Sequence, residues 1–245
     1  MSVILNVENI SKRFGGLLAL DDVSFKVRQG DILGVIGANG SGKTTLFSII
    51  SGFIEPTSGS VQLQGMEMAG RPPHEIAQRG IGRTFQIVRP FPDVSVFDNV
   101  VIGALAHERK VSHARARAAE VLELCGLYEK RNLLGGALPL VDRKRLEIAR
   151  ALAGNPHLLL LDEAMAGLRP REVDAALELI KAIHDQGVTL LIVEHVMRIL
   201  MGLADRVLVL NQGRVIAEDV PTVVSRDPNV IEAYLGKKYA QTQQS

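Results

Sequence analysis

The sequence contains a single cysteine, and its apolar runs are all short. With only Cys125, the chain cannot form an internal disulfide, which is typical of a reducing compartment. The longest apolar runs are Leu158–Leu161 and Val188–Val193, far below the roughly 20 residues that cross a bilayer as a helix. Repeats of solenoid length are missing as well, and the short polar end KKYAQTQQS is the one low-complexity stretch. These absences argue against disulfide-stabilised, membrane-spanning and repeat proteins.

An excess of one charge is missing too. The 28 Lys and Arg residues balance 27 Asp and Glu residues, so the net charge is +1. The chain therefore has no overall field that attracts nucleic acid or an anionic lipid surface, and any anion must be bound locally. The first residues, MSVILNVENISKRF, contain no apolar stretch of the kind found in a signal peptide. We expect a cytosolic chain that does not bind nucleic acid.

The composition that remains is that of a well-packed globular protein. Hydrophobic residues make up 47% and charged residues 22% of the 245 residues, and the mean hydropathy is +0.15. Apolar runs of the kind found in strands buried on both faces occur at Ile32–Ile36, His157–Asp162 and Val188–Val193. Helical periodicity follows or separates them, for example over Arg171–Gln186, which Gly187 should end. This alternation predicts a parallel α/β core.

Other patterns predict an antiparallel edge and a helical insertion. Alternating residues around Val3–Val7 and Val23–Val27 predict antiparallel strands, and Val207–Ala217 predicts a hairpin. A Pro-containing loop after Ile87 leads to helical stretches such as Arg115–Cys125. We therefore expect an α/β core with a β subdomain at 1–87 and 149–235, a helical subdomain at 88–148, and a polar C-terminal tail at 236–245.

One glycine-rich segment carries the clearest chemistry. It reads Gly37-Ala38-Asn39-Gly40-Ser41-Gly42-Lys43-Thr44, which fits G-x-x-x-x-G-K-[ST] and lies between an expected buried strand and an expected helix. Its glycines let backbone N–H groups approach phosphates, and the helix N-terminus adds positive potential. Lys43 is expected at the β- and γ-phosphates, the Thr44 hydroxyl on Mg²⁺ and Thr45 at the α-phosphate. The segment predicts a nucleoside triphosphate site.

Two adjacent carboxylates end the strand expected at His157–Asp162. Asp162 is expected to reach Mg²⁺ directly or through water, and Glu163 to polarise the water that attacks the γ-phosphate. Taken alone, an Asp-Glu pair after a strand is most often the solvated start of a loop. The phosphate loop upstream favours the catalytic interpretation.

The order of these motifs resembles the nucleotide-binding subunits of ABC transporters over nearly the whole chain. Arg83-Thr84-Phe85-Gln86 resembles the Q-loop, which implies that Gln86 contacts Mg²⁺ and couples the site to the helical subdomain. The strand that ends in Glu194-His195 resembles the H-loop, which implies that His195 senses the γ-phosphate. A neutral imidazole can accept and donate hydrogen bonds at once, which suits that role. Phe14 matches the aromatic that stacks on adenine in the family, although a core phenylalanine is equally compatible with its position.

Within this family, the chain most resembles the ATPase subunits of branched-chain amino-acid importers. The resemblance lies in five stretches: Arg83–Gln86, Val88–Phe91, Arg145–Leu152, Val193–Met197 and Met201–Arg206. It implies ATP and Mg²⁺ as cofactors, integral membrane permease subunits as partners, and an external binding protein that contributes indirectly. It also implies a position on the cytoplasmic face of a prokaryotic membrane. Related subunits for urea or lipopolysaccharide share some of these stretches and remain alternatives.

Other classes of P-loop protein are less compatible with the sequence. Soluble ABC-type ATPases that act on DNA or ribosomes usually carry a second cassette, a coiled coil or a basic extension, and the length and the +1 charge provide none of these. A P-loop kinase needs an acceptor pocket with a lid. A GTPase needs an Asn-Lys-x-Asp segment, which the sequence lacks. An ABC transport ATPase whose membrane partner docks near Gln86, with residues 88–92 as one wall, is therefore the main hypothesis.

Two segments depart from the family's pattern. Leu138-Pro139-Leu140-Val141-Asp142 stands where the family has Leu-Ser-Gly-Gly-Gln, and Arg169 stands where the D-loop usually ends in aspartate. Pro139 has neither a hydroxyl nor an N–H, and Asp142 is expected to bring negative charge toward phosphate. We therefore expect a heterodimer in which a second ATPase subunit supplies an intact signature. A homodimer remains possible if the basic residues at 143–145 restore positive charge at the signature.

Overall fold

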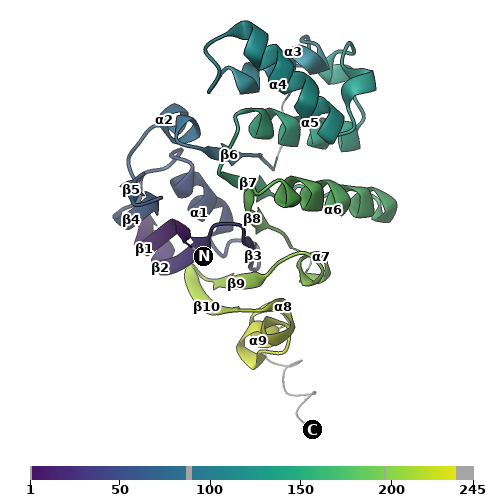
Figure 1. Ribbon diagram of the computed structural model, residues 1–245. Helices are drawn as coiled ribbons and strands as arrows, with labels where there is room; N and C mark the ends of the chain where they lie inside the picture. Colours follow the sequence, from purple (N-terminus) through teal and green to yellow (C-terminus); the bar gives the residue numbers. More distant parts are fainter. Residues whose placement is uncertain (1, 87–89, 196, 236–245) are drawn as a thin grey trace. The chain divides into compact units, whose positions relative to one another are not determined.

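The computed structural model describes residues 2–86, 90–195 and 197–235 of the chain. Residue contacts divide it into two units, of which the first contains Met1–Pro72 and Leu191–Ser245 and the second contains Pro73–Leu190 (Figure 1). The division falls inside β8 (Thr189–Val193). Within the described ranges, none of the helices combines the length and the hydropathy of a membrane-spanning segment.

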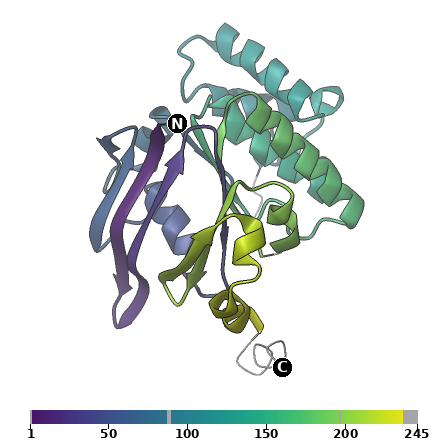
Figure 2. The ribbon, with the colours of Figure 1, turned by 60° about the horizontal axis from the view of Figure 1, so that its bottom comes forward.

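The first unit is built on strands. An antiparallel sheet has the order β2-β1-β4-β5 and consists of β1 (Val3–Phe14), β2 (Leu17–Arg28), β4 (Ser58–Leu63) and β5 (Met66–Glu67). Figure 2 shows its long β1–β2 hairpin at the purple end of the chain. The other strands are β3 (Ile32–Ile36), which lies parallel to β9 (Arg206–Asn211), and β10 (Arg214–Asp219), which pairs antiparallel with β9. The helices are α1 (Lys43–Ile50), α7 (Met197–Met201), α8 (Pro221–Val224) and α9 (Pro228–Leu235).

Alternation and burial explain these strands. In β1, Leu5 and Val7 are buried, whereas Asn6 is half-buried and Glu8 is exposed. Val7 lies opposite the buried Phe25 of β2. One face of the hairpin is therefore apolar. By contrast, all five residues of β3 are buried, as the continuous apolar run predicts. The expected N-terminal strands, the buried strand and the hairpin formed by β9 and β10 are all confirmed.

The second unit is mainly helical. Its helices are α2 (Pro73–Gln78), α3 (Val96–Ala104), α4 (Val111–Leu124), α5 (Leu140–Ala153) and α6 (Pro170–Asp185), with short 3₁₀ turns at η1 (Tyr128–Lys130) and η2 (Gly135–Ala137). Its strands β6 (Ile81–Arg83) and β7 (Leu158–Asp162) are parallel, with Ile81 opposite Leu158. Helix α3 packs against both α4 and α5. The predicted subdomain boundaries at 87/88 and 148/149 stay predictions, and the tail at 236–245 lies outside the described residues.

Helices α4 and α6 have the apolar faces that their periodicity predicts. Ala118, Val121 and Leu122 of α4 are buried, as is Cys125 directly after the helix. Burial raises the pKa of the Cys125 thiol to about 12. In α6 the buried residues recur at helical spacing: Ala176, Leu179, Ile180 and Ile183. The chain leaves α6 through Gly187, whose φ of 88° is the left-handed conformation that ends many helices.

Candidate functional site

The glycine-rich loop of residues 37–42 joins β3 to α1 in the first unit. Gly42 has a φ of 108°, and a Cβ there would lie 2.8 Å from the Ala19 carbonyl oxygen. A Cβ at Gly37 would lie 2.3 Å from the Leu210 carbonyl oxygen. Both positions require glycine, because the backbone passes too close to its neighbours for a side chain. The loop therefore presents bare backbone at the start of α1.

Lys43 is the first residue of α1, and its side chain folds back into this loop. The residue is 5% exposed, and its Nζ donates to the carbonyl oxygens of Gly37 and Ala38 at 2.7 and 3.0 Å. The first N–H groups of a helix have no carbonyl one turn before them. A glycine cradle, an ammonium group inside it and a helix N-terminus together fit nucleotide phosphates. Thr44 is exposed and Thr45 is half-buried, so the Thr44 hydroxyl is available to a metal ion.

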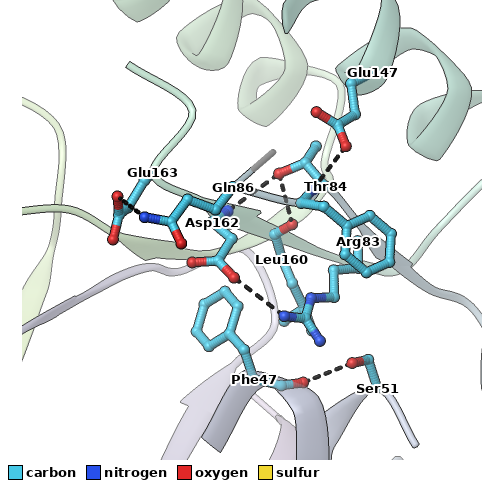
Figure 3. A network of polar contacts seen from close by, with 10 residues as sticks. Phe47, Ser51, Arg83, Thr84, Gln86, Glu147, Leu160, Asp162 and Glu163 are labelled. Atoms are coloured by element: carbon cyan, nitrogen blue, oxygen red, sulfur yellow. Dashed lines mark hydrogen bonds and ion pairs between the residues drawn. The ribbon is translucent and has the colours of Figure 1, made fainter. Parts of the chain in front are cut away.

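The two predicted carboxylates lie at the end of β7 in the second unit and have different partners (Figure 3). The Asp162 side chain is 2% exposed, and its Oδ2 lies 3.1 Å from Nη2 of Arg83. Glu163 is 6% exposed, and its Oε2 accepts a hydrogen bond from Nε2 of Gln86 at 2.9 Å. The structure therefore brings together Gln86 and Glu163, two of the three residues predicted to be catalytic.

Glu163 has an unusual backbone conformation. Its φ is 51°, in the left-handed region that residues with a side chain rarely adopt. The Nζ of Lys144, a buried residue of α5, donates to the Glu163 carbonyl oxygen at 3.0 Å. Strained conformations persist where neighbouring groups fix them, and they often occur at functional sites. Lys144 thus helps to hold the predicted catalytic base in place.

Each residue of the Arg83–Gln86 segment binds a group at this end of β7 or on α5 (Figure 3). Arg83 and Gln86 bind the two carboxylates, as described above. Thr84 follows Arg83, and its Oγ1 accepts a hydrogen bond from the Asp162 N–H at 3.1 Å. The Phe85 N–H donates to Oε1 of Glu147 at 2.9 Å. Sequence reasoning singled out Gln86 alone. The signal available for Arg83 was its positive charge at the end of a strand. That strand is parallel to the one that ends in Asp162, the carboxylate that Arg83 binds.

Charge and burial act against each other at two of these residues. Burial lowers the pKa of Arg83, and the charge of Asp162 opposes that effect. Burial also raises the pKa of Glu147 to about 7, against the Phe85 N–H and the charges of Arg150 and Lys144. Glu147 therefore changes charge near neutral pH.

This pKa predicts a pH-dependent stability. Because the pKa of folded Glu147 lies above its ordinary value of 4.5, the folded chain binds more protons than the unfolded chain between those values. Stability should then fall as the pH rises through about 7. Glu147→Gln keeps an oxygen for the Phe85 N–H but cannot ionise. We expect its melting temperature, relative to wild type, to increase from about pH 5 to about pH 8.

The control for this experiment is Glu123→Gln, which neutralises an exposed carboxylate after the middle of α4. Differential scanning fluorimetry of the three proteins across the pH range provides the measurement. Parallel curves for wild type and Glu147→Gln would show that Glu147 does not titrate in this range.

The remaining predicted residues lie in the first unit. His195 is exposed and follows Glu194, whose N–H donates to the Val35 carbonyl oxygen of β3 at 3.3 Å. Phe14 ends β1 with 45% of its surface exposed and the Lys12 Nζ 5.2 Å from its ring centre. Phe14 is therefore not a core residue, which leaves its face available to a ligand. Its stacking on adenine stays a prediction.

Comparison with known proteins identifies the family. A family model described as "ABC transporter" matches residues 20–166, more than half of the chain. The chain belongs to the ABC transporter family. A second model, described as "Branched-chain amino acid ATP-binding cassette transporter", matches residues 214–240 of this ABC cassette. The chain thus has the α/β fold of ABC ATPases. It is an ATP-binding, ATP-hydrolysing subunit that energises transport.

Similar ABC cassettes align with almost all of the chain. The high-affinity branched-chain amino acid transport ATP-binding protein LivG of Salmonella typhimurium is 40% identical, and the alignment covers 96% of this chain and 98% of that protein. BraF of Pseudomonas aeruginosa, with the same description, is 38% identical with the same coverage. The lipopolysaccharide export system ATP-binding protein LptB of Escherichia coli is 34% identical, again over 96% and 98%.

Solved ABC cassettes share the fold. The ADP conformation of an ATP-binding cassette of an ABC transporter superposes with a TM-score of 0.88 and 32% identity, covering 97% of this chain and all of that one. A dimeric post-hydrolysis ATP-binding cassette with bound ADP and Pi gives a TM-score of 0.80 and 26% identity, covering 89% and 99%. The family therefore binds adenine nucleotides in a fold that this cassette shares.

The signature segment of this ABC cassette, residues 138–142, lies at the start of α5. Pro139 is the N-cap of the helix and makes no side-chain cap, and Leu140 is 44% exposed. One expectation for this segment is wrong. Asp142 does not present a negative charge, because it is 3% exposed and forms an ion pair with Lys130. The exposed groups at this helix start are therefore apolar and not acidic.

The loop after β7 carries the second departure. Arg169 is exposed and is the N-cap of α6, where its N–H donates to Oε2 of Glu172 at 2.8 Å. The carboxylate of Glu172 thus caps the helix in place of a side chain at the N-cap itself.

Among the described residues, no three His, Cys, Asp or Glu side chains gather as a metal site.

Proposed function

We propose that this ABC ATPase energises the uptake of branched-chain amino acids through a prokaryotic membrane, on whose cytoplasmic face it acts. Identities of 38–40% to branched-chain amino acid transport ATP-binding proteins, over 96% of the chain, carry this proposal. The match of residues 214–240 to the branched-chain family model supports it independently. Cargo choice belongs to the membrane subunits and to an external binding protein.

The chain's own residues supply the hydrolytic chemistry. Lys43 and the bare backbone of the 37–42 loop bind the phosphates, and Phe14 stacks on the adenine. Glu163 accepts the proton of the attacking water, while its hydrogen bond with Gln86 fixes the direction of its carboxylate. His195 donates to the γ-phosphate. Each of these roles is assigned to a residue that the sequence motifs predicted.

The oxygen donors fit a magnesium ion bound together with the nucleotide. Thr44, Gln86 and Asp162 would hold it, since hydroxyl, amide and carboxylate oxygens are the donors that Mg²⁺ prefers. Bound there, Mg²⁺ would neutralise charge on the β- and γ-phosphates. The ion pair with Arg83 holds Oδ2 of Asp162 at 3.1 Å, so the carboxylate is already oriented before a metal ion binds.

Integral membrane permease subunits are the proposed direct partners. We name residues 90–95 the docking loop; residues 88 and 89 of the predicted wall lie outside the described part of the chain. Phe91 in this loop is 41% exposed, and the Arg150 guanidinium of α5 lies 4.7 Å from its ring centre. An exposed aromatic ring backed by an arginine suits a helix of a membrane subunit that docks with an apolar face.

The second proposed partner is another ATPase subunit with an intact signature. In the family's dimer, each site combines one subunit's phosphate loop with the other's signature. Here Pro139 offers neither an N–H nor a hydroxyl, and Leu140 has an exposed side chain where the family's signature has a bare glycine. A heterodimer therefore has one complete site, formed by this chain's phosphate loop, whereas a homodimer has none.

Transport in vesicles tests the proposed function. The chain is assembled with the membrane subunits and the binding protein encoded beside its gene, and uptake of labelled leucine is measured with ATP inside. We expect uptake that stops with Lys43→Ala, because the loss of a charge-assisted phosphate contact abolishes ATP binding. Uptake of urea, or export of lipopolysaccharide, without leucine uptake would contradict the amino-acid proposal.

A further inference from the structure

The turn between β9 and β10 contacts the phosphate loop, although none of the nucleotide-site motifs includes it. Gly213 is the second residue of this two-residue turn, and its N–H donates to the Ser41 carbonyl oxygen at 3.0 Å. Ser41 belongs to the glycine-rich loop of residues 37–42 and is 2% exposed. The turn is therefore bound to the loop two residues before Lys43.

The start of β2 contacts both the turn and the end of the loop. The Asp21 N–H donates to the Gly213 carbonyl oxygen at 2.9 Å, and the Asp21 Oδ2 accepts from Nε of Arg214 at 2.8 Å. A Cβ at Gly213 would lie 2.7 Å from the Ala19 carbonyl oxygen, and a Cβ at Gly42 would lie 2.8 Å from the same atom. One backbone carbonyl is thus packed against two glycines, one in the turn and one in the loop, and neither has room for a side chain.

The same hairpin also limits the other end of the loop. Leu210 of β9 lies next to the turn, and its carbonyl oxygen would be 2.3 Å from a Cβ at Gly37. The loop backbone is therefore held by the hairpin at Gly37 and at Ser41. A loop that is already ordered before its ligand arrives does not lose conformational entropy when the ligand binds, and this raises affinity.

We propose that Gly213 is a positioning residue for ATP binding, which holds the phosphate loop in the conformation that receives the β- and γ-phosphates. It acts through the Ser41 carbonyl group and through the space that its missing side chain leaves, and not by contacting the nucleotide. This inference rests on the proposed function, because it takes the loop of residues 37–42 to bind the phosphates.

The chain contains a matched turn that serves as the control. Gln64-Gly65 joins β4 to β5 just as Gln212-Gly213 joins β9 to β10. The φ values are 50° and 78° in the first turn and 48° and 79° in the second, and two positive φ values are typical of a type I′ turn. Apart from its chain neighbours, no atom of the described residues would lie within 4 Å of a Cβ at Gly65. An alanine therefore strains both turns equally, and at Gly213 it also meets the Ala19 carbonyl oxygen.

The main test measures the binding of MgATP to the full chain by calorimetry, below the melting temperature of every variant. We expect Gly213→Ala to raise the Kd about tenfold or more, because the loop must shift to make room for the Cβ. Gly65→Ala should change the Kd less than about twofold, although both variants lower the melting temperature. A wild-type Kd in folded Gly213→Ala, or an equal rise in Gly65→Ala, would overturn the proposal.

A second substitution separates backbone strain from the contact with the loop. Asparagine adopts the left-handed conformation more readily than alanine does, so Gly213→Asn should lose less thermal stability than Gly213→Ala. Its Cβ meets the same carbonyl oxygen, so its Kd for MgATP should stay as high as that of Gly213→Ala. A purely structural role of Gly213 would instead lower the number of binding sites per chain and leave the Kd unchanged, and that result would overturn the proposal.

Hydrogen exchange of the wild-type chain decides the question if the Gly213 variants do not fold. We expect a non-hydrolysable ATP analogue with Mg²⁺ to slow exchange in residues 37–42 and also in residues 211–214, because the Gly213 N–H is bonded to the loop. The matched turn at residues 63–66 should exchange at its original rate. Slower exchange in the loop without a change in residues 211–214 would overturn the proposal.

Lys43→Ala separates this inference from the proposed function. Lost ATP binding in Lys43→Ala together with a wild-type Kd in Gly213→Ala would overturn the role of Gly213 alone. A wild-type Kd in Lys43→Ala would count against the phosphate-binding role of the loop and so against the proposed function. The exchange data would then still show whether the turn and the loop are ordered together.

Discussion

Replacing Glu163 with glutamine should lower ATP hydrolysis about 10²–10⁴-fold while ATP remains bound. A glutamine cannot take a proton from water, but its oxygen can still accept from Nε2 of Gln86, as Oε2 of Glu163 does at 2.9 Å. Glutamine is no more strained than glutamate at the φ of 51° that this position has, so stability should change little. The bound ATP should then hold the assembled ATPase dimer closed.

Turnover is measured on the assembled transporter, and ATP affinity on the chain by calorimetry. Glu178→Gln makes the same chemical change at an exposed position of α6 and should leave turnover at the wild-type rate. Normal turnover by Glu163→Gln would assign the proton transfer to a different base. Lost ATP affinity would show that Glu163 acts in binding.

The isolated chain should turn over ATP about 10²–10³-fold more slowly than the chain with an ATPase partner that has an intact signature. The reason is the start of α5, where Pro139 and the exposed Leu140 replace the donors that stabilise the transition state. Of the basic residues at 143–145, Lys144 does not compensate. Lys144 is buried and donates to the Glu163 carbonyl oxygen.

Restoring the signature tests this expectation within the same chain. The triple variant Pro139→Ser, Leu140→Gly, Val141→Gly keeps Asp142 and should gain about 10² in turnover on its own. Adding Asp142→Gln should lower the melting temperature, because it removes the partner of Lys130 from a buried position. Robust turnover by the unmodified isolated chain, without a gain in the triple variant, would rule out the asymmetric heterodimer.

Sequence patterns predicted those elements whose signal is local. The apolar run of β3, the periodicity of α6 and the turn at Gly187 each contain their own evidence, and the structure confirms them within one or two residues. Helix α3 was not predicted on its own, and Asp98 and Asn99 interrupt its apolar residues. The amide of Asn99 binds the backbone of Phe91, Val94 and Ser95, and an asparagine at this position of the sequence does not reveal such contacts.

In the candidate site, too, the sequence revealed the residues whose signal is local and missed those whose partners are distant in the sequence. Lys43, Asp162 and Glu163 were predicted because short motifs place them at a loop or a strand end. Arg83 and Glu147 were not, because their partners lie 79 and 62 residues away in the sequence. The wrong expectation for Asp142 has the same cause, since its charge is balanced by Lys130, 12 residues before it. Contacts with residues of other elements are thus what the sequence patterns of this chain revealed least.

The burial of Cys125 makes this protein convenient for spectroscopic labelling. With a pKa of about 12, roughly one thiol in 10⁵ is ionised at neutral pH, so maleimide and methanethiosulfonate reagents should pass it over. Cysteines introduced at the exposed Met66 of the first unit and the exposed Leu105 of the second can then carry a pair of spin labels in an otherwise wild-type background. The distance between those labels would follow the two units through each round of nucleotide exchange.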